Sequence, residues 1–342
     1  MKRKTGLLWF VFFLLITSCV SFEKFSIEVY KPSELNFTSD IKKVALVSRN
    51  LKYTNDTLQN YQVKNRRLIR DKIRYNVDSV AIKTCLDSLA GRIIARNQFD
   101  TVFVLPVNTF PVMRVKEIRP AKMEWYKTVS EKTGADALIL LDMFSCFYTL
   151  TTDNSTPVAE VVTSNIWSVY QAREQKITDR FTQVDTLYWD ETDENGHYKK
   201  LRIPDKKNAI LLASGVIGEN YSKHIFPAWA KVERNFMLIG DQAFKKAVTL
   251  AQGSNWTEAS DIWQDFSQSN NKIRKTVALY NLALASEMNG DVDQALNYAG
   301  KAADASSGIF MSALNEAVRK YSVVLYQRKN EINKLKKQHE DR

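Results

Sequence analysis

The chain has 342 residues and a formal net charge of +11, which is moderately basic, with charges of both signs spread along it. This length, with ordinary apolar content, is sufficient for two hydrophobic cores. Only eleven glycines are present and no Gly-rich phosphate loop of either common type occurs among them. The composition therefore excludes a nucleotide site built on such a loop.

The first nineteen residues have the pattern of an export signal. Three basic residues at positions 2–4 precede ten apolar residues at positions 7–16, about half of what a spanning helix needs. The four residues 16–19 resemble the lipobox of bacterial lipoproteins, in which the cysteine is acylated and becomes the new N-terminus. The resemblance implies that residues 1–18 are a signal peptide and that Cys19 carries the lipid.

Either a lipoprotein signal or an ordinary secretory signal would take the protein out of the cytoplasm. We therefore expect a lipid-anchored protein of the cell envelope, at the outer membrane, that binds the membrane through its N-terminal lipid and has no nucleic-acid partner. Residues 19–37 are expected to be a linker to the anchor. The remaining cysteines, Cys85 and Cys146, are either a disulfide pair or two separate core thiols, and the apolar pattern around each favours the second.

Residues 38–204 have the pattern of an α/β domain, since short β-rich runs alternate with helical ones. Strands alternating with helices predict a partly parallel sheet with helices packed on it. The expected strands are residues 43–47, 101–105 and 137–141, and the expected helices are residues 80–95 and 124–133.

The later part of this domain predicts an antiparallel extension of the sheet. Residues 158–171 and 176–189 are rich in Val, Ile, Thr, Tyr and Trp, and a short polar segment separates them, which predicts a long hairpin. A further strand, 198–203, follows the turn signal Asn195-Gly196. A calcium loop here is excluded, because its twelfth position is Arg202 where a bidentate Glu is needed.

After Pro204 the pattern is helical to the end. Residues 205–240 are expected to form bridging helices, and residues 241–330 a helical repeat domain. Small residues recur after 36 residues: Ala247 and Ala259 in one unit, Ala283 and Ala295 in the next. This spacing resembles the tetratricopeptide repeat, so an all-α, tetratricopeptide-like domain of helical hairpins is expected. Residues 331–342 are expected to be a frayed, charged tail.

No catalytic motif is present in the sequence. It contains no Gly-x-Ser-x-Gly, Cys-x-x-Cys or His-Glu-x-x-His motif, and its three histidines have no metal-ligand spacing. His224, in an aromatic setting, is expected to be a packed structural residue. We therefore predict no catalytic residues, no metal and no cofactor.

The whole chain resembles an uncharacterised family of envelope lipoproteins from gut-type Bacteroidota. The resemblance rests on the lipobox, on residues 31–34 with 41–47, on residues 226–229 with Arg234, and on residues 256–263. No activity is assigned to that family, so the resemblance implies localisation and architecture only.

Two hypotheses about function remain. The first is a non-enzymatic binding or scaffold protein whose repeat groove holds a peptide or protein partner. The second is an envelope hydrolase or carbohydrate-processing factor with its site in the α/β domain, where carboxylates distant in sequence could meet. In stacked hairpins the first helix of each pair lines the groove, which predicts the partner-binding residues. These are Phe244, Lys245, Val248, Tyr280, Asn281 and Leu284.

Overall fold

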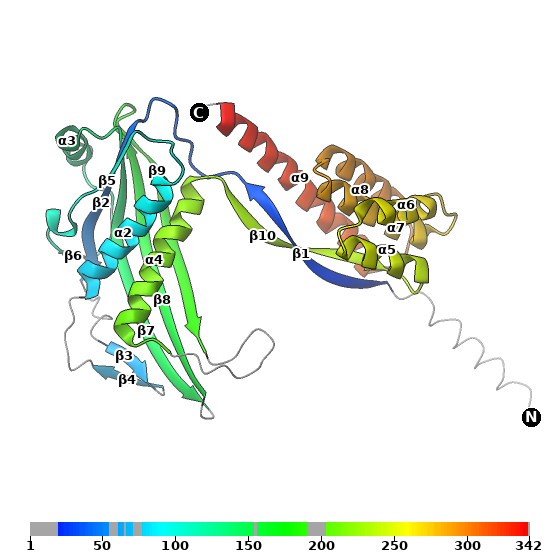
Figure 1. Cartoon of the computed structure of the whole chain (residues 1–342), viewed down its shortest axis with the longest axis horizontal. Helices are drawn as coiled ribbons and strands as arrows, with labels where there is room; N and C mark the ends of the chain where they lie inside the picture. Colours follow the sequence, from blue (N-terminus) through cyan, green and yellow to red (C-terminus); the bar gives the residue numbers. More distant parts are fainter. Residues whose placement is uncertain are drawn as a thin grey trace, which may run out of the picture. The chain divides into compact units, whose positions relative to one another are not determined.

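A computed structural model describes residues 20–54, 61–64, 66–70, 77–153, 156–190 and 203–340. These residues form two compact units. The sheet unit comprises residues 33–226, and the ribbon–helix unit comprises the segment up to Pro32 together with residues 227–340 (Figure 1). The expected signal peptide, Cys19 and the turn at Asn195-Gly196 lie outside the described residues. Within the described residues, no helix is both long enough and apolar enough to cross a membrane.

The sheet unit is built on a mixed sheet whose longest strands form a meander. In the meander, β7 pairs antiparallel with β8 and β8 with β9, while β2 pairs parallel with β7 and β5. The expected parallel strands and the long hairpin are confirmed, and the hairpin closes at Gln171 opposite Lys176. The strands are β2 (Lys43–Tyr53), β3 (Tyr61–Lys64), β4 (Arg67–Arg70), β5 (Thr101–Val104), β6 (Met113–Val115), β7 (Ala137–Asp153), β8 (Thr156–Gln171) and β9 (Lys176–Trp189).

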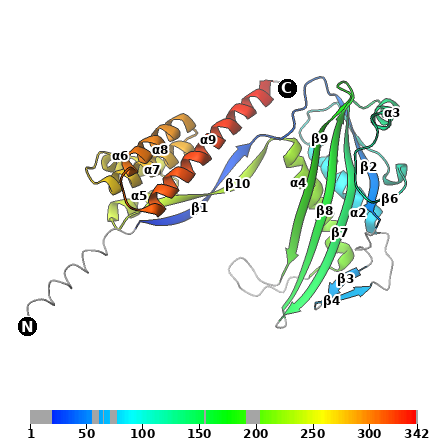
Figure 2. The same cartoon turned by 180° about the vertical axis from the view of Figure 1, so that it is seen from behind.

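Helices cover both faces of this sheet. Helices α2 (Val77–Ile94) and α4 (Lys206–Ile225) pack side by side on one face, over a large apolar core (Figures 1 and 2). Their backbones approach so closely at Gly218 that a Cβ atom there would overlap the carbonyl oxygen of Cys85. Helix α3 (Met123–Thr133) packs over a smaller core on the opposite face, with buried Tyr126 at its centre.

The expected bridging helices at residues 205–240 are corrected by the structure. Helix α4 belongs to the sheet unit, and residues Ala228–Leu238 form a strand, β10. Pro227 separates the two, and exposure along β10 alternates with a period of two up to residue 234, as a half-buried strand requires. The apolar residues Trp229, Phe236 and Met237 suggested a helix, but they lie in this strand.

The expected anchor linker at residues 19–37 is also corrected. Residues Ser21–Lys31 form the strand β1, which pairs antiparallel with β10 along its whole length, from Ser21 opposite Leu238 to Lys31 opposite Ala228. No strand near β1 in sequence pairs with it. Its partner follows about 200 residues later, and only tertiary folding brings the two together.

Five helices complete the ribbon–helix unit. Helices α5 with α6 and α7 with α8 form two antiparallel hairpins, and the four alanines of the expected repeat are all fully buried. The expected frayed tail at residues 331–342 is instead helical as far as Glu340, where Glu331 pairs with Arg328. The helices are α5 (Gln242–Gln252), α6 (Trp256–Ser267), α7 (Lys272–Met288), α8 (Val292–Ser306) and α9 (Ser312–Glu340).

Candidate functional site

The residues expected to line a partner-binding groove are packed inside the ribbon–helix unit. Among them only Lys245 is exposed. The other five are at most 4% exposed, so their side chains are not available to a partner in this arrangement. These five are Phe244, Val248, Tyr280, Asn281 and Leu284.

The groove face is covered by the chain's own strand. Both α5 and α7 contact β10, and Phe236 and Met237 of that strand belong to the same buried cluster as Phe244 and Leu284. Asn281, one of the residues expected to bind a partner, instead hydrogen-bonds the backbone of β10. Its Oδ1 accepts a hydrogen bond from the backbone N–H of Met237 at 3.0 Å, and its Nδ2 donates to the Met237 carbonyl at 2.8 Å.

A buried ion pair joins the same strand to α7. The Arg234 guanidinium donates to both oxygens of Glu287, at 2.9 and 2.6 Å, and the Tyr321 hydroxyl of α9 donates to Glu287 at 2.8 Å. The ring of Tyr280 lies 5.0 Å from that of Tyr321. Burial raises the pKa of both tyrosines, so both hydroxyls stay protonated at neutral pH. The inner face is therefore a closed polar network.

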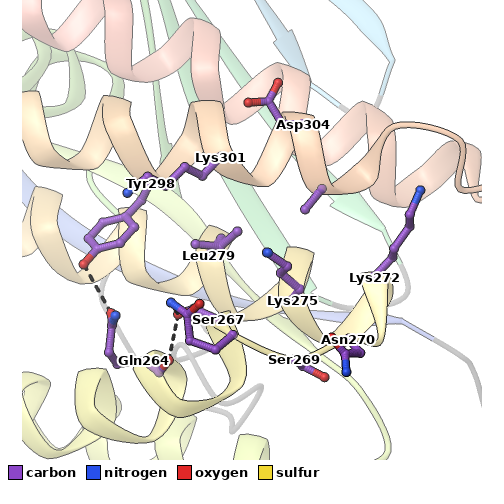
Figure 3. A pocket seen from close by; sticks show the side chains of 12 residues that line it. Gln264, Ser267, Ser269, Asn270, Lys272, Lys275, Leu279, Tyr298, Lys301 and Asp304 are labelled. Atoms are coloured by element: carbon purple, nitrogen blue, oxygen red, sulfur yellow. Dashed lines mark hydrogen bonds between the residues drawn. The ribbon is translucent and has the colours of Figure 1, made fainter.

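An open hollow lies on the other side of this unit, between α6, α7 and α8, and has a volume of about 640 Å³. Figure 3 shows that α6 and α8 form its two walls, with Tyr298 and Gln264 hydrogen-bonded across it at 3.3 Å. Its lining is Gln264, Ser267, Gln268, Ser269, Asn270, Lys272, Lys275, Leu279, Tyr298, Lys301, Asp304 and Ala305.

A second hollow of about 340 Å³ continues the first, because Gln264 and Tyr298 line both. We call the two together the outer groove. Its further lining is Ser260, Asp261, Leu282, Ala285, Ser286, Asn289, Asp291 and Gln294. The charges are separated along it, with acidic residues in the second hollow and mainly lysines in the first.

The lysines at the basic end are not neutralised by the groove itself. Lys301 lies 5.5 Å from the centre of the Tyr298 ring, and Lys272 donates to the backbone carbonyl of Ser307 at 3.2 Å. Within the described residues the Lys275 ammonium has no side-chain partner, and Asp304 is the single acidic residue of this lining. The basic end can therefore accept a carboxylate.

Sequence reasoning missed the outer groove because it assigned binding to the first helix of each hairpin. A usable signal was present in the first turn of α7, which carries Lys272 and Lys275 and no acidic residue. Helix N-termini favour acidic side chains, because the helix dipole is positive there. Lysines in that position are therefore unfavourable for the helix and point to a role outside it.

The sheet unit contains a buried ion pair, at a point where the register of two strands shifts. The register of β2 shifts between Ser48 and Leu51 and that of β7 shifts between Leu141 and Met143. Arg49 and Asp142 meet there, with 3.0 Å between Nη1 and Oδ1, and Ser168 donates to the other carboxylate oxygen at 2.6 Å. Burial raises the pKa of the Asp142 carboxyl, and the Arg49 charge acts in the opposite direction. Both oxygens are satisfied, as in a structural ion pair.

Two further expectations concern single residues of the sheet unit. His224 packs as expected, with its ring 4.0 Å from that of Phe181, and the structure adds a carboxylate partner, Asp179, at 3.0 Å. Cys85 and Cys146 are both buried and form no disulfide, which confirms two separate core thiols. In the described part of the chain, no group of three or more His, Cys, Asp or Glu residues is placed to hold a metal ion.

Two family models match the chain. The domain of unknown function DUF8603 matches residues 41–237, which cover the sheet unit from β2 onward and most of β10. The domain of unknown function DUF6340 matches residues 245–334, which cover the helices from α5 to most of α9. No curated protein matches the chain.

Proposed function

We propose that this chain, which belongs to the family defined by the domain of unknown function DUF8603, is a lipid-anchored envelope protein that binds a peptide segment of a partner in its outer groove. The proposal keeps the non-enzymatic binding function expected from the sequence. It moves the binding surface from the inner face of the hairpins to the opposite side. The hairpins α5/α6 and α7/α8 are, in this proposal, tetratricopeptide-like units.

The observation that carries the proposal is the outer groove with its separated charges. A hollow of about 640 Å³ continues into one of about 340 Å³. An elongated, shared hollow of this kind suits an extended segment rather than a compact small molecule. Leu279 and Leu282 at the floor are almost fully buried, so the surface that a ligand would contact is mainly polar. The polar side chains of the walls supply hydrogen-bonding partners for a backbone.

The charges define the class of segment. Lys275 and Lys301 would pair with an acidic side chain or a C-terminal carboxylate. Asp261 and Asp291 would pair with a basic side chain further along, although Asp291 already accepts a hydrogen bond from the backbone N–H of Gln294 at 2.8 Å. Tyr298, between the two ends, is a rigid aromatic anchor of the kind that dominates binding energy in interfaces.

A selection experiment tests this proposal without knowledge of the natural partner. Random peptides displayed on phage are selected on the purified mature protein, and the enriched peptides are measured by titration. We expect acidic peptides whose affinity falls about tenfold to hundredfold with Lys275→Glu and Lys301→Glu together, since a hydrogen bond to a charged group contributes about 1.5–3 kcal/mol. Lys245→Glu, an exposed lysine of α5 outside the groove, is the matched control.

Two results would count against the groove. Binding of the enriched peptides to the double variant as tightly as to the unaltered protein would place their site elsewhere. Equal losses in the double variant and in Lys245→Glu would mean that binding responds only to net charge.

The anchor is tested separately. The thiol of Cys19 is the group that would carry the thioether-linked lipid, so Cys19→Ala should abolish membrane association and leave the unprocessed precursor. A membrane-bound Cys19→Ala protein of mature mass would overturn the lipoprotein assignment.

A further inference from the structure

We propose that the end of the ribbon–helix unit that carries Phe22 and Phe310 lies directly against the membrane surface. We call this end the aromatic end. The inference rests on the proposed lipid at Cys19 and goes beyond it, because an anchor by itself leaves the distance between protein and membrane open.

The first argument is the length of the tether. Strand β1 begins at Ser21, two residues after Cys19. An extended chain spans at most about 3.6 Å per residue, so the strand starts within about 7 Å of the lipid-bearing residue and Phe22 lies within about 11 Å. The polar headgroup layer on each side of a bilayer is itself about 5–7 Å thick. No spacer therefore separates the folded unit from the headgroups.

The second argument is that β1 cannot bend away to create a spacer. Each of its residues from Ser21 to Lys31 faces a partner in β10. Near its start, the ring of Phe25 stacks on that of Phe236 at 4.3 Å, and Phe236 is fully buried in the helical core. Opening this end of the ribbon would expose that core, so the start of β1 moves with the whole unit.

The third argument is that two exposed aromatic residues lie at this end. Phe310 is fully exposed, at 104%, and Phe22 is 40% exposed. Phe22 lines a hollow of about 320 Å³ together with Ala313, in the first turn of α9 and three residues after Phe310. The hollow extends along α9 as far as Val324, so the strand and helix starts fix the position more closely. Figures 1 and 2 show that β1 and α9 begin at the same end of this unit; Phe22 is the second residue of β1, and Phe310 precedes α9 by two residues.

The loop that carries Phe310 is held in place by its own hydrogen bonds. Asn315 Nδ2 donates to the Ile309 carbonyl at 2.9 Å, and the Ile309 N–H donates to the Ser306 carbonyl at 3.0 Å. Ile309 and Met311, on either side of Phe310, pack on the helical core. The loop thus buries its neighbours and presents one large ring to the outside.

The occupant that fits this end is the interfacial layer of a lipid bilayer. A fixed, fully exposed Phe is unfavourable in water, and aromatic rings are favourable at membrane interfaces. The short tether places this surface within reach of the headgroups. A second copy of the chain or a partner protein on the same surface are the alternatives that an experiment separates.

The test uses the processed, lipidated protein in vesicles of phosphatidylethanolamine and phosphatidylglycerol. Phe310→Cys carries an environment-sensitive nitrobenzoxadiazole label, and Phe22→Cys provides a second labelled site. Tyr326→Cys is the matched control, because it is an aromatic of the same unit that is 63% exposed and lies 13 residues beyond Ala313 on α9, about 20 Å along the helix. Cys85 and Cys146 are buried and do not compete for the label.

We expect the labels at positions 310 and 22 to shift to the blue, to be quenched by brominated lipids and to lose most of their quenching by aqueous iodide. The label at position 326 should remain open to iodide and insensitive to brominated lipids. Diluting the protein in the membrane should leave these results unchanged.

Each other outcome overturns the proposal in a recognisable way. If mass spectrometry of the N-terminal peptide shows the lipid but position 310 is as open to iodide as position 326, the anchor stands and the membrane contact fails. If the label is shielded from iodide but brominated lipids do not reach it, protein covers the surface. If the peptide carries no lipid, the anchor fails and this inference fails with it.

Discussion

The side chain of Asn281 forms two hydrogen bonds with the backbone of Met237, one through each atom of its amide. The two residues are 44 positions apart, one in α7 and one in β10, and both are fully buried. An Asn in this position can hold any extended backbone, because it recognises the peptide group and not a side chain. Here the backbone it holds belongs to the same chain.

Asn281→Ala should lower the free energy of unfolding by about 1–3 kcal/mol. The substitution leaves the N–H and C=O of Met237 buried without a partner, and an unsatisfied buried polar group costs that amount. Urea unfolding measures the change. Asn297→Ala on the exposed side of α8 is the control and should have little effect. Equal values for the two variants would show that Asn281 does not stabilise the ribbon.

Arg234→Met should cost about 3–5 kcal/mol of stability, because it leaves the Glu287 carboxylate, 3% exposed, without its cation. Replacing both residues by Met should recover most of this loss, since no charge then remains buried. Lys24→Met tests a neighbouring pair with Glu233 that is solvent-exposed, and should cost less than about 1 kcal/mol. If the double variant is as unstable as Arg234→Met, the unpaired charge of Glu287 is not the cause of the lost stability.

Gly218→Ala should destabilise the sheet unit by about 1–3 kcal/mol or more. The added methyl group overlaps the backbone of α2, so the two helices must separate and the core beneath them loses contacts. Gly91→Ala in α2 adds the same atom where no heavy atom lies within 4 Å. This control should be neutral or stabilising by up to about 1 kcal/mol, since Ala is the better helix former. Thermal unfolding followed by circular dichroism distinguishes the two.

Stability should fall as the pH rises above about 10, the usual pKa of tyrosine. Burial raises the pKa of several tyrosines in the folded protein, so above that pH the unfolded chain has lost protons that the folded chain still holds. The stabilisation is complete below about pH 10 and is lost at higher pH. The residues concerned are Tyr126, Tyr148, Tyr170, Tyr221, Tyr280 and Tyr321.

A spectrophotometric titration measures this effect. The buried tyrosines should ionise together, above about pH 10, in step with loss of the circular dichroism signal. A single smooth titration of all tyrosines in a still folded protein would contradict the burial described here.

Local patterns in the sequence were enough to predict the parallel strands, the long hairpin of the sheet and the helical hairpins, but not β1 or β10. The alternating apolar residues of β8 and β9 and the polar turn between them determine a hairpin by themselves, since period, turn and partner are adjacent in sequence. The same holds for α7 and α8, where Gly290 with a positive φ of 80° ends the turn between helices that bury Ala283 and Ala295. The apolar residues around Cys85 and around Cys146 likewise predicted that each thiol is buried in a core.

Tertiary structure alone decided what those elements cover. Strand β1 lies about 200 residues from β10, so no local pattern in either segment reveals the pairing, and the first segment resembled a linker. The ribbon then fills the face on which Tyr280 and Asn281 lie, which turns expected binding residues into core. Helix α9 continues through its charged end, and Arg328, just before that end, donates to the backbone carbonyl of Tyr30 at 2.7 Å, a contact that charge content along the sequence does not encode. Periodicity fixes which side of an element is apolar, whereas only the packed chain decides whether that side meets a partner or its own backbone.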